Sequence, residues 1–173
     1  MILVLIGYMG SGKSTLGKVL ANKLNYSFID LDDFIEEQEK SSISDIFKTK
    51  GEIYFRRKET EYLKDILNNN QRLVLSVGGG TPCYTGNMQV ILDSENATGI
   101  YLKASIPTLV KRLQKDKSKR PLISHIKTEE LLTEFIGKHL FERSPFYRQA
   151  QVTISTDHKT EKDIIEELIF QLF

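Results

Sequence analysis

The sequence predicts an α/β fold, a three-layer sandwich in which a central five-stranded parallel sheet lies between layers of helices. Short apolar runs bounded by turn residues alternate along the chain with segments of helical periodicity, the pattern of strands joined by crossover helices. The first run, ILVLI at residues 2–6, is apolar throughout, as expected of a strand covered on both faces. With 173 residues, 40% of them hydrophobic and 27% charged, the chain is expected to form one globular domain over residues 1–173.

The remaining strands are expected at four further runs that are rich in apolar and β-branched residues. These runs are residues 26–30, 72–77, 99–103 and 151–155. Glycines follow the first and third strands, and aspartates close the second. Because the carboxyl ends of parallel strands open toward the ligand crevice of such folds, functional residues are expected there.

Helices are expected between the strands, where apolar residues recur at helical spacing. Ile43, Ile46 and Phe47 share one helical face behind a serine pair able to cap the helix. A long helix is expected to begin at Thr128 and to be stopped by Pro145. The last helix has an apolar stripe made by Ile164, Ile165, Leu168, Ile169 and Leu172.

Composition excludes several classes of protein. The net charge of +1 provides no overall basic field, which argues against a nucleic-acid partner. The apolar N-terminal run breaks at Gly7 and has no basic leader, so neither a signal peptide nor a membrane span is expected. The single cysteine, Cys83, cannot form an internal disulfide, which suits a reducing cytoplasm. We therefore expect a cytoplasmic protein without membrane or nucleic-acid partners, and we take it to be a monomer.

The stretch GYMGSGKST, directly behind the first strand, predicts a nucleotide site. Gly7-x-x-x-x-Gly12-Lys13-Ser14 fits the Walker A spacing in its required strand–loop–helix context. Its glycines let backbone N–H groups surround phosphate oxygens, and the following helix adds the positive end of its dipole. Lys13 is expected to reach the β- and γ-phosphates, and the Ser14 hydroxyl to ligate Mg²⁺. The residues expected to hold the nucleotide here are Gly10, Ser11, Gly12, Lys13, Ser14 and Thr15.

The chain lacks the sequence signatures of other classes of nucleotide-binding protein. A Rossmann fingerprint fails because Thr15 stands where its third glycine belongs. A GTPase should show a DxxG switch, but no glycine of this chain has an aspartate three residues before it. A motor-type ATPase should place an acidic residue after a central strand, where this chain has Gly78.

The segment IDLDD, which closes the second strand, carries candidate acids. In extended chain Asp30 and Asp32 point to one side and Asp33 points away from them. Asp30 is then expected to face a metal ion and Asp32 an acceptor hydroxyl. Asp33 and Glu36 have the spacing of a capping box, so Asp33 is expected to cap the next helix.

Three further motifs each allow two interpretations from the residues alone. The glycines of VGGGTP (77–82) form either a turn or bare backbone against a ligand. Arg56 of FRRKE could simply form helical ion pairs with Glu52 and Glu59. Arg143 of ERSPFY could complement a helix dipole.

The segment 111–123 is also ambiguous. It has six basic residues and one acid between Lys111 and Arg120. It is either a solvated loop or a mobile segment whose cations meet a polyphosphate.

Taken together, the motifs resemble one enzyme family. GxxGSGKST, DxD, FRR, GGG, RPL and RxPxY, in this order over nearly the whole chain, are similar to those of shikimate kinase. The resemblance implies a P-loop kinase of the nucleoside-monophosphate-kinase type with a mobile lid at about 112–124 and an acceptor-binding part at about 31–60. It also implies transfer of the γ-phosphoryl group of ATP, with Mg²⁺, to the 3-hydroxyl of shikimate in aromatic biosynthesis.

The resemblance assigns roles residue by residue. Asp32 would hold the shikimate hydroxyls and help to deprotonate one of them, and Asp30 would act on Mg²⁺. The shikimate carboxylate would be bound by Arg56 and Arg143, since a guanidinium matches both carboxylate oxygens. Arg120 would be the lid arginine that meets the transferring phosphate. Further contacts are implied for Gly78, Gly79 and Gly80 with the ring hydroxyls, and for Arg112 with adenine, beside the loop at Thr156 and Asp157.

Three rival functions are considered. Another small-molecule kinase of this fold, for gluconate or a nucleotide, would not need the joint FRR, GGG and RxPxY set. A nucleotide-binding regulatory module without turnover would be favoured by loss of Lys13, Asp32 or Arg120, and all three are present. A nucleic-acid role for the basic segment is disfavoured by the low net charge.

Overall fold

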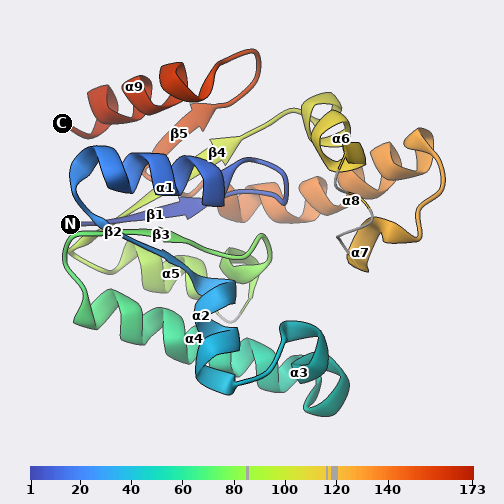
Figure 1. The fold of residues 1–173 in the computed structure, drawn as a ribbon, viewed down its shortest axis with the longest axis horizontal. Coiled ribbons are helices and arrows are strands. Elements are labelled where there is room, and N and C mark those ends of the chain that lie inside the picture. The colour runs from blue at the N-terminus through green and yellow to red at the C-terminus, as the bar shows by residue number, and fades with distance from the viewer. Residues whose placement is uncertain (85, 116, 118–120) are drawn as a thin grey trace.

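The computed structural model describes residues 1–84, 86–115, 117 and 121–173. Over these residues the strands form one five-stranded, all-parallel sheet in the order β2-β3-β1-β4-β5 (Figure 1). The strands are β1 (Ile2–Ile6), β2 (Ser27–Asp30), β3 (Leu73–Ser76), β4 (Ala97–Lys103) and β5 (Val152–Ser155). The predicted α/β sandwich is confirmed, and each strand lies within two residues of its predicted bounds.

The helices that the structure describes fill the connections between the strands. Those before β4 are α1 (Lys13–Leu24), α2 (Leu31–Glu39), α3 (Ile43–Thr49), α4 (Gly51–Asn69), the short 3₁₀ helix η1 (Thr81–Cys83) and α5 (Asn87–Leu92). Those after it are α6 (Ile106–Lys115), α7 (Pro121–Ser124), α8 (Glu129–Tyr147) and α9 (Glu161–Leu172). None of these helices combines the length and the apolar character that a bilayer crossing needs.

Strand β1 shows why the sheet is buried on both faces. Its side chains alternate, so Ile2, Val4 and Ile6 pack into one hydrophobic cluster while Leu3 and Leu5 pack into a second. The second cluster includes residues of α1 and α9, and the first includes residues of α2, α4, α5, α6 and α8. Figure 1 shows the sheet between these two helical layers.

The starts of α3 and α8 agree with the prediction, whereas the end of α8 does not. Ser42 caps α3 by accepting a hydrogen bond from the Asp45 N–H (3.1 Å), and Thr128 caps α8. Pro145 was expected to stop α8, and this was wrong, because the helix runs on to Tyr147. Proline removes only one N–H from the last turn, and the buried Tyr147 side chain holds that turn against the body.

Two glycines in helices make a matched test of this packing. A Cβ added at Gly17 in α1 would lie 2.6 Å from Phe28 Cε2, whereas one at Gly137 in α8 would meet only Ile106 Cδ1 at 3.8 Å. Gly17→Ala is therefore expected to lose stability by overpacking, and Gly137→Ala to gain helix propensity. Their free energies of unfolding, measured in denaturant, should differ by about 1–3 kcal/mol. Equal stabilities would mean that α1 has room to move off the sheet.

Candidate active site

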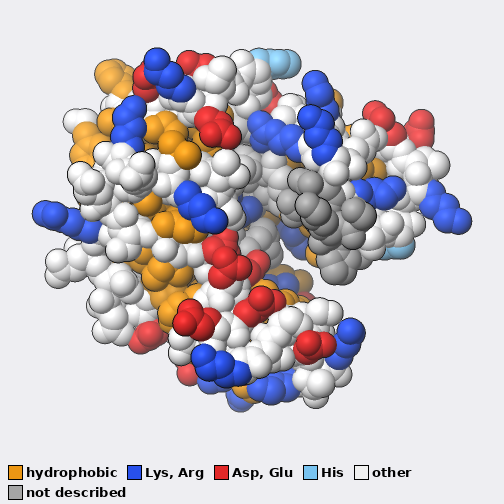
Figure 2. All heavy atoms as spheres, in the orientation of Figure 1, with side chains coloured by type: hydrophobic (Ala, Val, Ile, Leu, Met, Phe, Trp, Pro, Cys, Tyr) orange, Lys and Arg blue, Asp and Glu red, His pale blue; other side chains and the backbone are white. Residues whose placement is uncertain are grey.

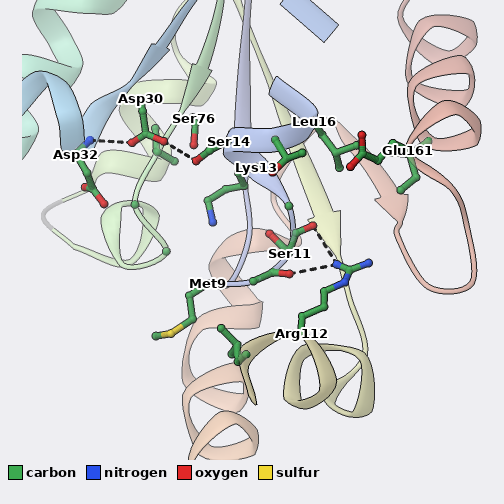
Figure 3. Close-up of a pocket in the computed structure, with 18 of the residues that line it drawn as sticks. Met9, Ser11, Lys13, Ser14, Leu16, Asp30, Asp32, Ser76, Arg112 and Glu161 are labelled. Atoms are coloured by element: carbon green, nitrogen blue, oxygen red, sulfur yellow. Dashed lines mark hydrogen bonds between the residues drawn. The ribbon is translucent and has the colours of Figure 1, made fainter. Parts of the chain in front are cut away.

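A hollow of about 520 Å³ lies at the carboxyl ends of the central strands. Its walls come from the loop after β1, the start of α2, the loop after β3, the end of α6 and the start of α9 (Figure 3). Every residue predicted from the Walker A pattern to hold the nucleotide lines it, as do Asp30, Asp32 and Arg112. This hollow has the residues that a site for a nucleoside triphosphate needs.

The loop after β1 has the backbone of a phosphate cradle. Gly10 (φ 80°) and Gly12 (φ 100°) adopt left-handed conformations that favour glycine, and Gly12 directly precedes the first residue of α1. Lys13 Nζ donates to the carbonyls of Gly7 (2.8 Å) and Tyr8 (3.1 Å), which holds the ammonium group beneath the loop. The buried Ser11 Oγ has no hydrogen-bond partner among the described residues. The cradle therefore presents a cation and a helix N-terminus to one ligand.

Two oxygen-bearing side chains meet beside the cradle. Ser14 Oγ donates to Asp30 Oδ2 (2.6 Å), and Asp30 Oδ1 accepts from the Asp32 N–H (3.1 Å). Figure 3 shows Ser14, Asp30 and Lys13 on the same wall of the hollow. Hydroxyl and carboxylate oxygens are the ligands that Mg²⁺ prefers, so the predicted pair fits this ion.

The start of α2 differs from two expectations about the aspartates of IDLDD. Asp30, not Asp33, caps the helix, because its side chain accepts from the Asp32 N–H while its own backbone is still extended (φ −96°, ψ 123°). Asp32 consequently lies in the first turn of α2 and not in extended chain, so the strand-based reason for pairing it with Asp30 was wrong. Asp33 is exposed on the helix.

Asp32 lies in an electrostatic environment that disfavours its charge. Burial, together with repulsion from Asp30 and Glu59, raises the pKa of Asp32 from 3.8 to about 6, and the nearby Lys13 partly opposes this shift. A carboxylate with such a pKa is ionised at neutral pH and is a stronger base than an ordinary aspartate. Asp32 is thus suited to accept a proton.

A second hollow of about 360 Å³ adjoins the first. Met9, Asp32, Gly78 and Gly79 line both hollows, so these residues mark their junction. The second hollow is also lined by Ile43, Phe47, Phe55, Arg56, Glu59, Gly80, Leu122 and Arg143. The space-filling view shows the surface hollowed between the α2–α4 part and the α6–α8 part, with acidic side chains along one margin (Figure 2). The second hollow thus combines two guanidinium groups with an acid at the junction.

Arg56 forms the two helical ion pairs that the sequence allowed, with the exposed Glu52 and with the buried Glu59. Its Nη1 donates to Glu59 Oε2 (2.9 Å), and Glu59 is 1% exposed and also accepts from Thr81 Oγ1 (2.6 Å). Sequence reasoning missed this role of Glu59. The signal was present, since Glu59 lies one helical turn from both Phe55 and Leu63, within an apolar stripe.

Helix α8 positions Arg143 by contacts on both sides of it. One turn earlier, His139 Nδ1 lies 3.1 Å from the hydroxyl of the buried Tyr8, over whose ring the Arg143 guanidinium also lies. One turn later, the Tyr147 hydroxyl donates to the Gly79 carbonyl (2.5 Å). A single face of α8 therefore connects the start of the phosphate loop to the glycine loop. Neither Tyr8 nor His139 was identified from the sequence.

The remaining predicted residues lie around α6 and α7. Arg112 donates to the Gly10 carbonyl (3.2 Å) and the Thr156 carbonyl (3.2 Å), so it joins the phosphate loop to the loop after β5. Arg120 lies outside the described residues. At the end of the predicted lid Ile123 is buried in the core, whereas Leu122 is 59% exposed and lines the second hollow.

Comparison with known proteins gives consistent results over nearly the whole chain. The family model described as shikimate kinase matches residues 9–173. The shikimate kinase of Flavobacterium psychrophilum is 46% identical over 171 residues, covering 99% of this chain and 98% of the relative. That of Flavobacterium johnsoniae is 43% identical over 167 residues, covering 96% of each chain.

Solved structures agree with these relatives. The shikimate kinase of Bacteroides thetaiotaomicron superposes with a TM-score of 0.90 at 35% identity, covering 99% of this chain and 98% of that one. The shikimate kinase of Acinetobacter baumannii, solved in complex with shikimate, gives a TM-score of 0.85 at 31% identity, covering 99% of this chain and 92% of that one.

Proposed function

The chain belongs to the shikimate kinase family, and on that premise we propose which substrate each of its two adjoining hollows binds. It catalyses the ATP-dependent phosphorylation of shikimate at the 3-hydroxyl, a step of aromatic amino acid biosynthesis. The first hollow binds ATP and the second binds shikimate. The observation that supports this division is that Asp32, Gly78 and Gly79 line both hollows, where the two substrates must meet.

The second hollow matches the functional groups of shikimate, one carboxylate and three hydroxyls. Arg56 and Arg143 bind the carboxylate, and Gly78, Gly79 and Gly80 offer backbone to the hydroxyls. Asp32, at the junction, orients the 3-hydroxyl and accepts its proton. As the hydroxyl oxygen forms its bond to the γ-phosphorus, the bond from that phosphorus to the bridging oxygen breaks, and ADP leaves.

The first hollow holds the phosphates through the cradle from Gly10 to Thr15. Lys13 neutralises the charge on the phosphoryl oxygens, and Ser14 and Asp30 would hold Mg²⁺. When bound, the ion offsets negative charge on the phosphates. Mg²⁺ is commonly held by one or two protein oxygens together with phosphates and water, so this pair would be enough to hold it.

Several further assignments rest on the family resemblance. Arg112 contacts adenine, Arg120 of the lid segment 112–124 meets the transferring phosphate, and the part at about 31–60 binds the acceptor. The whole chain acts as one domain. We further propose a cytoplasmic monomer that binds neither nucleic acid nor membrane.

Replacement of either carboxylate-binding arginine by lysine tests the second hollow. Arg56→Lys and Arg143→Lys keep the charge but lose the two-pronged donor geometry. Each is expected to raise the KM for shikimate about tenfold, the effect of losing one charge-assisted hydrogen bond, while the KM for ATP changes little. Unchanged KM values for shikimate would reduce both arginines to structural ion pairs.

The function itself is tested by ATP consumption in a coupled assay. ADP release should depend on shikimate and should not be stimulated by gluconate or nucleoside monophosphates. Release stimulated by one of those acceptors would indicate another small-molecule kinase. ATP binding without turnover on any acceptor would indicate a regulatory module.

A further inference from the structure

The side chain of Arg56 forms a wall between two spaces. It lines the second hollow, and it also lines an outer groove on α4 of about 740 Å³. Tyr84, at the end of η1, lines only the outer groove. Tyr84 therefore lies behind Arg56 as viewed from the acceptor.

The Tyr84 ring lies against the Arg56 guanidinium group, with Cζ 3.9 Å from the ring centroid. At this distance the cation interacts directly with the π face. The Tyr84 side chain is 37% exposed. Burial in the core therefore does not account for its position.

Gly80 leaves space on another side of the same group. Its backbone (φ −89°, ψ −21°) is one that any residue adopts, so conformational freedom does not require glycine here. A Cβ at Gly80, however, would lie 3.2 Å from Arg56 Nη2 and 3.3 Å from Nη1. The guanidinium group would have to shift by a few tenths of an ångström.

The acids around the Arg56 guanidinium group explain why a neutral ring, and not another acid, suits the position beside it. Glu59 already binds Nη1, and the Glu52 carboxylate lies 3.5 Å from Nε, which has no hydrogen-bond partner among the described residues. A further acid would weaken the attraction of Arg56 for a carboxylate ligand. A neutral ring restrains the plane of the group and leaves its N–H donors available.

We propose that Tyr84 is a positioning residue that holds the Arg56 guanidinium group in the orientation that binds the carboxylate of shikimate. This inference rests on the proposed role of Arg56. Tyr84 acts through Arg56 and is not among the described residues that line the second hollow. Its ring, and not its hydroxyl, carries the effect.

Steady-state kinetics of Tyr84 variants test the proposal. Tyr84→Ala should raise the KM for shikimate about two- to fivefold, the range of an exposed cation–π contact, with kcat and the KM for ATP unchanged. Tyr84→Phe should behave like the parent. The matched control is Lys64→Ala, which truncates an exposed side chain of the same groove outside the segment 31–60 and should leave the KM for shikimate unchanged.

A double-mutant cycle with Arg56→Lys tests the role of Tyr84 separately from the role of Arg56. Lysine has no planar group to stack, so adding Tyr84→Ala to Arg56→Lys should raise the KM for shikimate less than it does in the parent. If Arg56→Lys raises this KM but Tyr84→Ala does not, or if the two effects simply multiply, the inference fails and the carboxylate site stands. If Arg56→Lys itself has no effect, the role of Arg56 fails, and the inference with it.

Discussion

Replacement of Asp32 by asparagine is expected to lower kcat by about 10²–10⁴-fold, the usual contribution of a positioned base, with the KM for ATP little changed. Asparagine keeps the size of the side chain but cannot accept the hydroxyl proton. The matched control is Asp33→Asn, one residue further along α2, where the side chain is exposed and kcat should stay near the parent value. Loss of nucleotide binding in the Asp32 variant would instead assign Asp32 to the metal.

The same substitution should make the protein more stable at neutral pH. The pKa of Asp32 is about 6 in the folded protein and near its ordinary value of 3.8 in the unfolded chain, so between these values the folded state binds more protons. Stability contributed by this group therefore falls as pH rises from 3.8 to 6, and the full penalty is present above 6. Removing the charge should raise the unfolding midpoint at pH 7 by roughly 2–8 °C and should have little effect below pH 4.

The pH dependence of the parent enzyme supplies an independent readout. Since protonated Asp32 cannot act as a base, kcat/KM for shikimate should fall as pH drops below about 6. In the Asp32→Asn enzyme, the residual kcat/KM for shikimate should not show this fall at low pH. A fall with the same midpoint in the variant would assign the titration to another group.

Lys13→Ala is expected to lower kcat by about 10³-fold or more, a loss comparable to that of a cation that contacts the transferring phosphoryl group. The side chain is anchored by two carbonyls of its own loop, so the ammonium group is placed before any ligand binds. Near-normal turnover in this variant would show that the cradle is not the phosphate site.

Lys18→Ala is the matched control for Lys13→Ala. Lys18 lies on the same helix, and its side chain is exposed and lies over the Phe28 ring at 5.8 Å. Its removal changes the net charge by the same amount without touching the hollow. Turnover should remain close to that of the parent, and both variants should unfold cooperatively in thermal melts.

Local patterns in the sequence predicted the features that depend on neighbouring residues. The strand at 2–6, the glycine loop and the helix behind it are contiguous, so their spacing alone indicated both the structure and its ligand. The helix cap in IDLDD is different, because several acids in that run have suitable side chains. The end of β2 in the sheet decides which one caps, and that depends on the pairing with β3, far along the chain.

The acceptor side could be predicted only in part for a similar reason. Arg56 and Glu59 have the spacing of a surface ion pair. The apolar stripe around Glu59 indicates its burial, but its hydrogen-bond partner, Thr81, comes from a distant loop that the spacing does not reveal. The contact of Tyr84 with Arg56 joins two segments that no periodicity relates. Motif order identified the family, whereas these contacts depend on how α4 and η1 pack in the folded chain.

The central place of β1 in the sheet also has a consequence for incomplete chains. β1 precedes the other strands of the sheet in the sequence, yet it pairs with β3 on one edge and with β4, which begins at Ala97, on the other. β1 pairs with residues 97–101 of β4, so a chain that ends before Ala97 leaves one edge of this uncharged, wholly apolar strand without its partner. Such an edge is a template for pairing between chains. Chains shorter than this length therefore expose an edge at which two copies can pair.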